Sequence, residues 1–492
     1  MASEQWVVYM WILLGVYASV ILFFVIRGAR KTTNIADYAI GTIGFSPWVV
    51  GLSLAASMTS AATFIINPGF IALYGISGVL SFGIVLPIAA FLSLIIFTKG
   101  FAKYGSSVKA NTMAEWIGNR FNNKNYAFFF AIIALLLITF IVLINVGLTQ
   151  VISKSLNLSP TLVLAGITVF VFGYMMFGGA NSMVYTNTIQ SIIMLIVAII
   201  LIYSGIDHFS DGINGFLSKL NKIDPNLTTT TNPKSFLFRD YFEIIVTQFI
   251  IGIAIVCQPH IITKSLLLKN PKKINTYLFS GILFMIFFFL VVVVGLYARI
   301  EFPALSFDGK PLKMDEIIPT YVVSKFSVGI GMVVIIGLIS AGLSTLESLI
   351  QSLSITITSD IIKPLRKGKL KNTILTNKLV IVVLAIISFA LSLNQLKNPN
   401  LSVAIFAQNG VYAYFSAAFV PVLFGTFLKN VQTRTVFIAS ISAIVLHFGI
   451  YYGRITPYMQ EPVNNPGVSA AIAIVISLLI GLVLHQIKPK NI

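Results

Sequence analysis

Apolar segments long enough to cross a lipid bilayer fill most of this 492-residue chain. A spanning helix needs about 20 mostly apolar residues, and thirteen segments meet that need: 6–27, 44–71, 77–98, 125–152, 158–178, 184–206, 241–263, 275–299, 326–361, 378–395, 402–426, 435–452 and 467–487. Only 10% of the residues are charged, whereas soluble proteins are nearer one quarter charged. We therefore predict an all-α polytopic membrane protein with about 13 transmembrane helices. No polar stretch is long enough to form a soluble enzyme domain.

Lysine and arginine are unevenly divided between the two sides of the predicted bundle. With alternating loops, 22 of the 33 basic residues fall on one side, including a cluster from Lys363 to Lys371, and 11 fall on the other. The positive-inside rule places the richer side in the cytoplasm. We therefore expect an outside N-terminus, a cytoplasmic C-terminus and a multi-pass location in the plasma membrane, which is the inner membrane in a bacterial cell. The net charge of +18 is dispersed over short loops and does not predict nucleic-acid binding.

A polar stripe runs along the apolar segment from Val328 to Ile357. Small and hydroxyl residues recur there every three or four positions, which is one face of a helix: Gly337, Ala341, Ser344, Thr345, Ser348 and Ser352. Glu347 lies on the adjoining face, and a carboxylate at membrane depth costs on the order of 2.5–3.5 kcal/mol, so we expect it to be paired. The stripe fits either close packing between two helices or a cation site.

Two predicted spans contain residues that interrupt a helix. The segment from Trp48 to Tyr74 is rich in Gly, Ala, Ser and Thr and contains Asn67-Pro68-Gly69 near its end. The segment from Ile244 to Ile262 contains Gln258-Pro259-His260. Five spans separate their starts, so the two run in opposite directions. Interrupted helices in corresponding positions of two inverted halves indicate a site near the membrane midplane. We predict one transporter domain over 1–492, with an extra helix at 6–27, a first repeat at 44–206, a second repeat at 241–426 and extra helices at 435–487.

Four segments together resemble the sodium:solute symporter family. IGTIGFSPWVVGLSLAASMTSAATF is similar to that family's first core helix, FGGANSMVYTNTIQSIIML to its fifth, GIAIVCQPHIITKSL to its sixth and GLISAGLSTLESLIQSLS to its eighth. The resemblance covers nearly the whole chain and departs at Asn187, where the family usually has Asp. It implies a LeuT-like fold of five plus five helices in an inverted repeat, with one extra helix before it and two after it. It also implies alternating-access uptake of a small polar organic solute, with Na⁺ as the coupling ion.

The resemblance assigns one sodium ion to the contact between the first and eighth core helices. Its ligands would be the backbone carbonyls of Ala56, Thr59 and Ala341 and the hydroxyls of Ser344 and Thr345. Several neutral oxygens suit a hard cation. Backbone carbonyls become available only where a helix unwinds, which the composition from Ala56 to Thr59 permits. The alternative for the two hydroxyls is a hydrogen bond to the carbonyl four residues earlier in their own helix.

A second hypothesis concerns Glu347 and Asn187. Some family members bind a second sodium with the Asp that Asn187 replaces, and the carboxylate of Glu347 could take over that charge from across the site. Asn187, Glu347 and Ser348 would then hold a second cation, or Glu347 would carry a proton. The alternative is that Glu347 is a neutral, hydrogen-bonded acid with a structural role.

By the same resemblance, the solute lies beside the broken helices. The candidate residues for solute binding are Ser60, Thr63, Gln248, Gln258 and Gln408. Each of them could instead form a hydrogen bond between packed helices. The fourth span, Tyr126 to Val151, carries no charge, which favours a sugar, a polyol, a neutral amino acid or a small carboxylate such as pantothenate.

Sodium symport has three rivals at this point. A proton-coupled symporter using Glu347 would transport in acid without sodium. A membrane-embedded enzyme would need clustered His, Asp or Cys, which the spans lack, and a symporter-like sensor would need a separate output protein. We expect no catalytic residue, a small-molecule partner, contact with membrane lipid, no nucleic-acid partner and action as a monomer.

Overall fold

The computed structural model describes residues 4–105, 110–268, 270–398, 402–460 and 463–486. Within them, ten helical stretches are long and apolar enough to cross a membrane: Glu4–Ala29, Ile76–Gly100, Lys124–Leu156, Ala180–Phe209, Ile274–Glu301, Val328–Leu365, Thr373–Lys397, Val403–Phe427, Thr433–Gly453 and Pro466–Gln486. Two bent helix pairs raise the number to 12 if each pair is one span. The all-helical, multi-pass architecture predicted from the sequence is confirmed.

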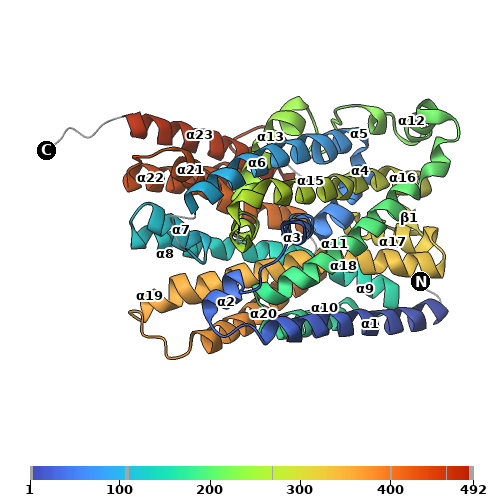
Figure 1. Cartoon of the computed structure of the whole chain (residues 1–492). Helices are drawn as coiled ribbons and strands as arrows, with labels where there is room; N and C mark the ends of the chain where they lie inside the picture. Colours follow the sequence, from blue (N-terminus) through green and yellow to red (C-terminus); the bar gives the residue numbers. More distant parts are fainter. Residues whose placement is uncertain (1–3, 106–109, 269, 399–401, 461–462, 487–492) are drawn as a thin grey trace.

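The labelled helices of Figure 1 divide these stretches where the winding changes. The long ones are α1 (Glu4–Ala29), α6 (Leu86–Gly105), α9 (Ile138–Leu156), α10 (Pro160–Met175), α11 (Ala180–Tyr203), α15 (Ile274–Leu290), α18 (Val328–Thr356), α20 (Thr373–Lys397), α21 (Val403–Phe427), α22 (Thr433–Gly453) and α23 (Pro466–Gln486). The short ones are α2 (Ile35–Ile40), α5 (Ile76–Gly78), α7 (Met113–Arg120), α8 (Lys124–Ile133), α12 (Gly212–Ile223), α16 (Val294–Glu301), α17 (Ile317–Lys325) and α19 (Lys363–Leu365).

Short 3₁₀-helical and π-helical segments join or extend these helices. The 3₁₀ segments are Ala134–Leu137, Ile206–Phe209, Pro225–Thr228, Ile255–Cys257, Thr263–Leu267, Pro271–Lys273, Val291–Val293 and Met314–Glu316. The π-helical segments are Ala62–Ile66, Val79–Val85, Phe242–Thr247 and Ile357–Ile362. Two antiparallel hairpins complete the described chain: β1 (Ser306–Phe307) with β2 (Lys310–Pro311), and β3 (Met459–Gln460) with β4 (Val463–Asn464).

The segment 158–178 forms a shorter helix than a span requires. It folds as α10, which has 16 residues and is capped at its start by the Ser159 hydroxyl. The helix stops because the chain turns at Gly178 and Gly179, and Gly179 has a φ of +85° that favours glycine. The count of thirteen spans therefore stays a prediction.

Both predicted breaks are present. In the first broken span, α3 (Pro47–Met58) and the helical stretch Ala62–Tyr74, which ends in α4 (Asn67–Tyr74), meet at 56°. In the second, Phe242–Cys257, which contains α13 (Gln248–Ala254), meets Pro259–Leu267, which begins with α14 (Pro259–Ile262), at 62°. Asn67-Pro68-Gly69 does not interrupt the span, because these residues start α4. Proline is tolerated in a first helical turn, where its missing N–H has no partner to lose.

Two helices form the centre of the bundle. In α21, 83% of the most apolar window is buried, and the figure for Val328–Leu365, which contains α18, is 72%. The corresponding values are 22% for α1 and 28% for α20, so these two helices lie at the periphery. The polar stripe of α18 therefore faces other helices, and α3, α9 and α11 pack against it.

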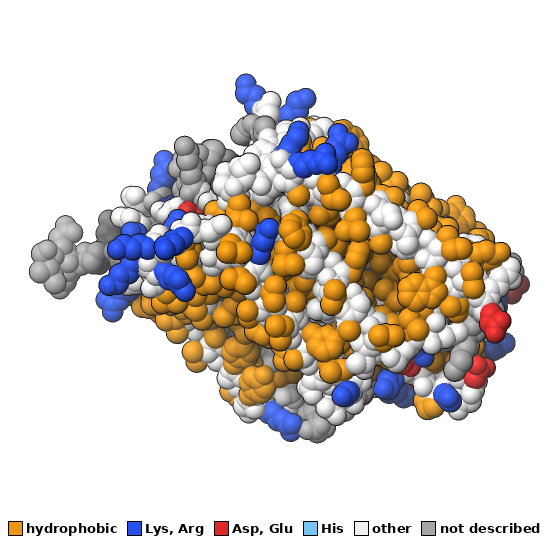
Figure 2. All heavy atoms as spheres, turned by 90° about the horizontal axis from the view of Figure 1, so that it is seen from below, with side chains coloured by type: hydrophobic (Ala, Val, Ile, Leu, Met, Phe, Trp, Pro, Cys, Tyr) orange, Lys and Arg blue, Asp and Glu red, His pale blue; other side chains and the backbone are white. Residues whose placement is uncertain are grey.

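The surface divides into a hydrophobic belt and two polar ends. We call the end with α7, α19 and the cluster Lys363–Lys371 the basic end, and the end with α12, β1 and α17 the acidic end (Figure 1). Figure 2 shows blue side chains mainly at the left and top, red ones mainly at the right among further blue ones, and a wide orange surface between. Exposed apolar residues such as Trp11 on α1 and Val169 on α10 belong to this surface, which fits a lipid-facing belt.

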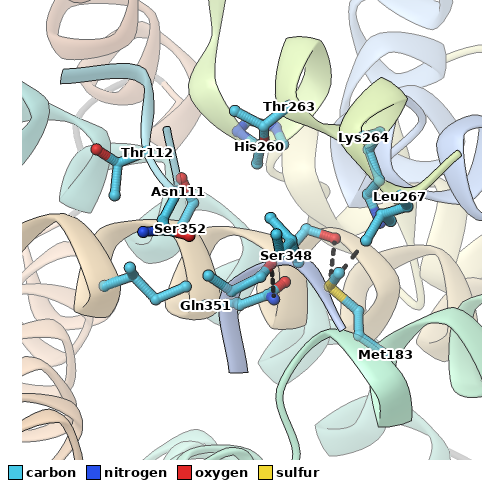
Figure 3. Close-up of a pocket in the computed structure, with 13 residues that line it drawn as sticks. Asn111, Thr112, Met183, His260, Thr263, Lys264, Leu267, Ser348, Gln351 and Ser352 are labelled. Atoms are coloured by element: carbon cyan, nitrogen blue, oxygen red, sulfur yellow. Dashed lines mark hydrogen bonds between the residues drawn. The ribbon is translucent and has the colours of Figure 1, made fainter. Parts of the chain in front are cut away.

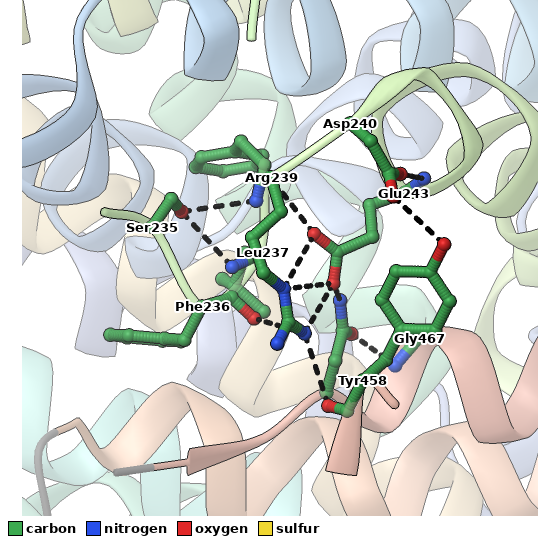
Figure 4. A network of polar contacts seen from close by, with 10 residues as sticks. Ser235, Phe236, Leu237, Arg239, Asp240, Glu243, Tyr458 and Gly467 are labelled. Carbon is green, nitrogen blue, oxygen red and sulfur yellow. Dashed lines mark hydrogen bonds and ion pairs between the residues drawn. The ribbon is translucent and has the colours of Figure 1, made fainter. Parts of the chain in front are cut away.

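A buried ion pair fastens the start of the second broken span at the acidic end (Figure 4). The Arg239 guanidinium donates to the Glu243 carboxylate at 2.6 Å and to the Tyr458 carbonyl at 3.0 Å. Asn465 donates to the same carboxylate at 2.8 Å. These contacts join the segment before α13 to the β3–β4 hairpin before α23. An ion pair satisfied on several sides tolerates burial, whereas an unpaired charge would not.

Candidate ion and solute site

The first break exposes backbone oxygens at the end of α3. Thr59 has extended dihedrals, φ −111° and ψ 109°, so the helix cannot continue through it. Ser60 follows outside any helix, and its hydroxyl accepts a hydrogen bond from the Ala62 amide at 3.1 Å. Carbonyls in the last turn of a helix lack intrahelical partners. The Ala56 and Ser57 carbonyls are therefore open to contact from α18.

Hydroxyls of α18 make that contact. The Ser344 hydroxyl donates to the Ala56 carbonyl at 2.8 Å and to the Ala341 carbonyl at 3.1 Å. The Thr345 hydroxyl lies 3.3 Å from the Ala56 carbonyl and 3.3 Å from the Ser57 carbonyl. The structure thus brings Ala56, Ala341, Ser344 and Thr345 together.

Thr59 lies in the break beside them, with its own hydroxyl turned to the Ala55 carbonyl at 2.6 Å. These five residues, which we call the oxygen set, are all fully buried. The two α18 hydroxyls reach across to α3 and do not merely bond within their own helix. The set offers neutral oxygens only, three carbonyls and two hydroxyls, which is a donor set suited to a hard monovalent cation.

The second break depends on Pro259. Gln258 is extended, with φ −70° and ψ 137°, because the residue before a proline avoids the helical region. The Gln258 side-chain nitrogen donates to the Ile255 carbonyl at 3.2 Å and so replaces a lost helical bond. The Gln258 side-chain oxygen is buried and accepts no hydrogen bond from the described residues. It is therefore available to a ligand.

Both breaks line one pocket. Its cavity volume is about 100 Å³, which is smaller than the 300–1,000 Å³ of usual small-molecule sites. Its polar residues are Ser60, Thr63, Asn67, Gln258, Gln408 and Tyr412, and its apolar ones include Phe82, Phe140, Leu143 and Phe289. No charged residue belongs to the lining. The lining therefore combines uncharged polar and aromatic side chains.

Four of the five predicted solute contacts line this pocket, and Gln248 does not. Gln248 is the first residue of α13 and is nearly buried. A side chain at Gly467 of α23 would meet the Gln248 amide nitrogen at 3.9 Å. Gln248 therefore faces α23. It lies ten residues before the break, and residues at different positions along a helix point toward different neighbouring helices.

Glu347 is held by three donors. The Tyr174 hydroxyl donates to its carboxylate at 2.7 Å, the Thr186 hydroxyl at 2.5 Å and the Gln190 amide at 3.0 Å. These partners come from α10 and α11. The Glu347 carboxyl group therefore has a hydrogen-bond partner on each of three side chains. This geometry separates Glu347 from Asn187 and Ser348, with which it was grouped from the sequence.

Asn187 and Ser348 belong to a different group, the serine–asparagine cluster, whose members are Ser53, Ser57, Asn187 and Ser348. The Asn187 side-chain nitrogen lies 3.3 Å from the Ser53 hydroxyl, 3.1 Å from that of Ser57 and 3.5 Å from that of Ser348. The Ser57 and Ser348 hydroxyls are 2.9 Å apart. The cluster is buried one helical turn from the oxygen set.

Lys264 reaches this cluster, and the sequence analysis missed it. Its ammonium nitrogen lies 3.0 Å from the Ser53 hydroxyl and 3.8 Å from the Met183 sulfur, and the residue is only 3% exposed. Lys264 was assigned to a cytoplasmic loop because it ends an apolar segment. A usable signal was its position one turn after His260, in a helix that restarts at Pro259.

A separate buried carboxyl, Asp315, lies outside the spans near the acidic end, where it accepts a hydrogen bond from the Ser402 hydroxyl at 3.1 Å. Burial raises the pKa of Asp315 to about 6, and the bond from Ser402 opposes that rise. The folded state therefore binds this proton more tightly than the unfolded state. The contribution of Asp315 to the free energy of unfolding is therefore fully present below about pH 4 and is lost as the pH rises through 6.

We expect Asp315→Asn to abolish the loss of stability between about pH 4 and 6. It should raise the free energy of unfolding at pH 7 by up to about 3 kcal/mol. Melting curves of the purified protein between pH 4 and 7 measure this. Asp308→Asn, at the exposed tip of the β1–β2 hairpin, is the control and should leave the curve unchanged. An Asp315→Asn protein with the wild-type pH profile would contradict the prediction.

Comparison with known proteins places this geometry in context. The family model described as "Sodium:solute symporter family" matches residues 38–443. The sodium/pantothenate symporter of Haemophilus influenzae is 26% identical over 411 residues, covering 81% of each chain. That of Escherichia coli is 24% identical over 469 residues, covering 93% of this chain and 92% of the relative. A Staphylococcus aureus sodium/proline symporter is 24% identical and covers 87% of this chain and 82% of its own.

Two solved structures share the fold. A Na⁺-coupled sialic acid symporter in a substrate-bound outward-open state superposes with a TM-score of 0.78 at 17% identity, covering 96% of this chain and 98% of that one. The nucleobase-cation-symport-1 family transporter Mhp1, in a closed conformation, gives a TM-score of 0.54 at 14% identity, covering 92% and 95%. The LeuT-like transporter fold expected from the sequence is therefore present.

Proposed function

This chain belongs to the sodium:solute symporter family, and from that premise we propose which of its residues bind the ion and the solute and how the two are coupled. Its relatives are transporters and not enzymes, so sodium-coupled symport across a membrane is its activity. The observation that carries the proposal is that both broken helices line one uncharged pocket, and the first of them also carries the oxygen set.

The oxygen set is the proposed sodium site. Ala56, Thr59 and Ala341 would supply carbonyls, and Ser344 and Thr345 would supply hydroxyls. The hydroxyl protons now point at the Ala56 and Ala341 carbonyls. When the ion enters, these protons turn away and the freed lone pairs face the ion. Neutral ligands hold a monovalent cation weakly enough for release, which transport requires.

The unwound segment from Thr59 to Ala61 links ion and solute. Thr59 contributes to the oxygen set, and the next residue, Ser60, lines the solute pocket. An ion that fixes the Thr59 carbonyl also fixes the position of Ser60. Each ligand then favours the conformation that the other binds, which is what coupling requires.

The pocket favours a solute with both polar groups and an apolar face. Amide and hydroxyl side chains lie at Ser60, Thr63, Gln258 and Gln408, and the lining also includes aromatic side chains. A small hydroxy-amide carboxylate of the pantothenate type fits this combination, with its negative charge balanced by the bound sodium ion. Proline is the second candidate, because relatives named for both solutes match the chain.

We propose uptake into the cytoplasm, with the basic end inside. A tenfold sodium gradient supplies about 1.4 kcal/mol, and about 100 mV of membrane potential adds roughly 2.3 kcal/mol per charge. For a neutral solute such as proline, the two terms give about 3.7 kcal/mol, which supports roughly several-hundredfold accumulation. For a monoanion of the pantothenate type, a one-to-one cycle moves no net charge, so only the sodium gradient of about 1.4 kcal/mol acts and supports about tenfold accumulation.

Uptake into proteoliposomes tests the function. Labelled pantothenate should accumulate when sodium is outside and the lumen is negative, and should not accumulate when choline replaces sodium. Labelled proline is assayed in parallel. Uptake in choline that increases with acidity would show a proton-coupled cycle instead. Accumulation of neither solute would remove the substrate assignment and leave a broader solute screen to be made.

Gln258 provides a direct test of the pocket. Gln258→Ala removes a side-chain oxygen that has no other partner, so we expect the KM for the solute to rise roughly 3- to 10-fold, the value of one hydrogen bond of 0.5–1.5 kcal/mol. Gln248→Ala is the matched control, because it is a buried glutamine of the same span that faces α23. Equal KM changes in the two variants would contradict the pocket assignment.

A further inference from the structure

We propose that the ammonium group of Lys264 is a built-in cation that fills the serine–asparagine cluster, so that the protein binds one sodium ion and not two. This inference rests on the proposed sodium coupling and adds its stoichiometry. Lys264 lies on the second half of one broken span, while Ser53 and Ser57 lie on α3 of the other. A single side chain therefore joins the two interrupted helices.

The three serine hydroxyls of the cluster already have N–H donors, whereas the buried Asn187 side-chain oxygen has no hydrogen-bond partner among the described residues. The Ser57 hydroxyl donates to the Ser53 carbonyl at 2.8 Å, and the Ser348 hydroxyl donates to the Ser344 carbonyl at 2.8 Å. Their remaining lone pairs face inward, where the Asn187 amide approaches them. The Ser53 hydroxyl receives both Asn187 and Lys264. A metal ion would compete for lone pairs that N–H donors already use.

Charge excludes a second ion more strongly than donor count does. The serine and asparagine side chains are neutral, so among the described residues that hydrogen-bond to the cluster Lys264 brings the only formal charge. A sodium ion beside a buried ammonium would be repelled at short range in a low-dielectric interior. Glu347, the nearby counter-charge, is engaged by three donors from α10 and α11.

Lys264 lies where a movable cation is useful. Figure 3 shows it beside Met183 and Ser348, at the edge of a pocket lined by Asn111, His260, Thr263 and Gln351. The pocket opens toward the basic end, because residues of the segments before α7 and at the end of the second broken span line it. A change in the angle of the second broken span would withdraw the ammonium from Ser53. Lys264 thus ties the conformation of that span to the turn of α3 just before the oxygen set.

Counting sodium ions tests the inference. Binding of radioactive sodium to the purified wild-type protein should saturate at one ion per molecule, and the sodium-to-solute flux ratio should be one. The double variant Asn187→Asp/Lys264→Gln supplies a carboxylate and removes the ammonium, so both values should rise to two. Asn187→Asp alone keeps the ammonium, which pairs with the new carboxylate, so it should stay at one. Lys272→Gln, an exposed lysine of the same end, is the control and should also stay at one.

Two results would overturn the inference: two ions in the wild-type protein, or one ion in a folded double variant. The wild-type count decides the matter even if the double variant does not fold. Absence of any sodium binding or sodium dependence in all variants would instead contradict the proposed function. The two failures are therefore distinguishable.

Discussion

Replacing Ser344 and Thr345 together with alanine is expected to abolish measurable sodium-driven uptake at ordinary sodium concentrations. Each hydroxyl is a proposed ligand of the ion, and a bond to a charged group contributes about 1.5–3 kcal/mol. The loss of two such bonds weakens sodium binding by about 3 kcal/mol or more, which is roughly 150-fold. The apparent affinity for sodium, measured as the sodium concentration that gives half-maximal uptake, should shift by at least that factor.

A matched pair on the same helix controls for the chemistry of the change. Ser354 and Thr356 are also buried on α18, and their hydroxyls donate only to the Gln351 and Ser352 carbonyls of their own helix. Ser354→Ala/Thr356→Ala should therefore leave sodium activation unchanged. If the Ser344/Thr345 variant kept undiminished uptake with the wild-type sodium response, the oxygen set would not be the sodium site.

Glu347→Ala is expected to destabilise the fold strongly. The change leaves the Tyr174, Thr186 and Gln190 donors without a partner inside the bundle and leaves the buried Lys264 without its nearby counter-charge. Breaking a buried charge arrangement on one side costs about 3–5 kcal/mol. Denaturant unfolding and melting in detergent should both show this loss.

Glu301→Ala is the control, because Glu301 is exposed at the acidic end and should tolerate the change. Glu347→Gln separates structure from proton transport, since it retains the volume and one acceptor oxygen. We expect a smaller stability loss and an unchanged sodium stoichiometry and pH profile of uptake. A Glu347→Gln protein that lost pH-dependent uptake would show that the carboxylate carries a proton, contrary to its three-donor geometry.

Much of the site could be predicted because its residues repeat at helical spacing. Ser344 and Thr345 were expected to share a face with Ala341, and the structure joins them to α3 as that spacing requires. Pro259 predicted the second break by local sterics alone. The first break was predicted in the correct span, where the composition from Ala56 to Thr59 permits unwinding, and it lies at Thr59 and Ser60, while Pro68 falls in the first turn of α4.

Other residues could not be placed from the sequence, since a helical period gives a face but not the neighbour that the face meets. Gln248 and Gln258 have the same side chain in the same span, yet one faces α23 and the other the pocket. Glu347 was grouped with Asn187 and Ser348, but it turns to α10 and α11. Lys264 was counted as a loop residue, and folding back at Pro259 buries it.

The sequence by itself determined that this chain is a multi-pass helical transporter of its family, which two of its spans are interrupted, and that Glu347 lies within the bundle. Insertion, helix formation and helix breaking depend on residues within a few turns of each other, so these features can be predicted locally. Only the tertiary structure decided which oxygens meet and where the ammonium lies. Ser57 meets Ser348, and Lys264 meets Ser53, across 291 and 211 positions of chain, and packing alone sets such contacts.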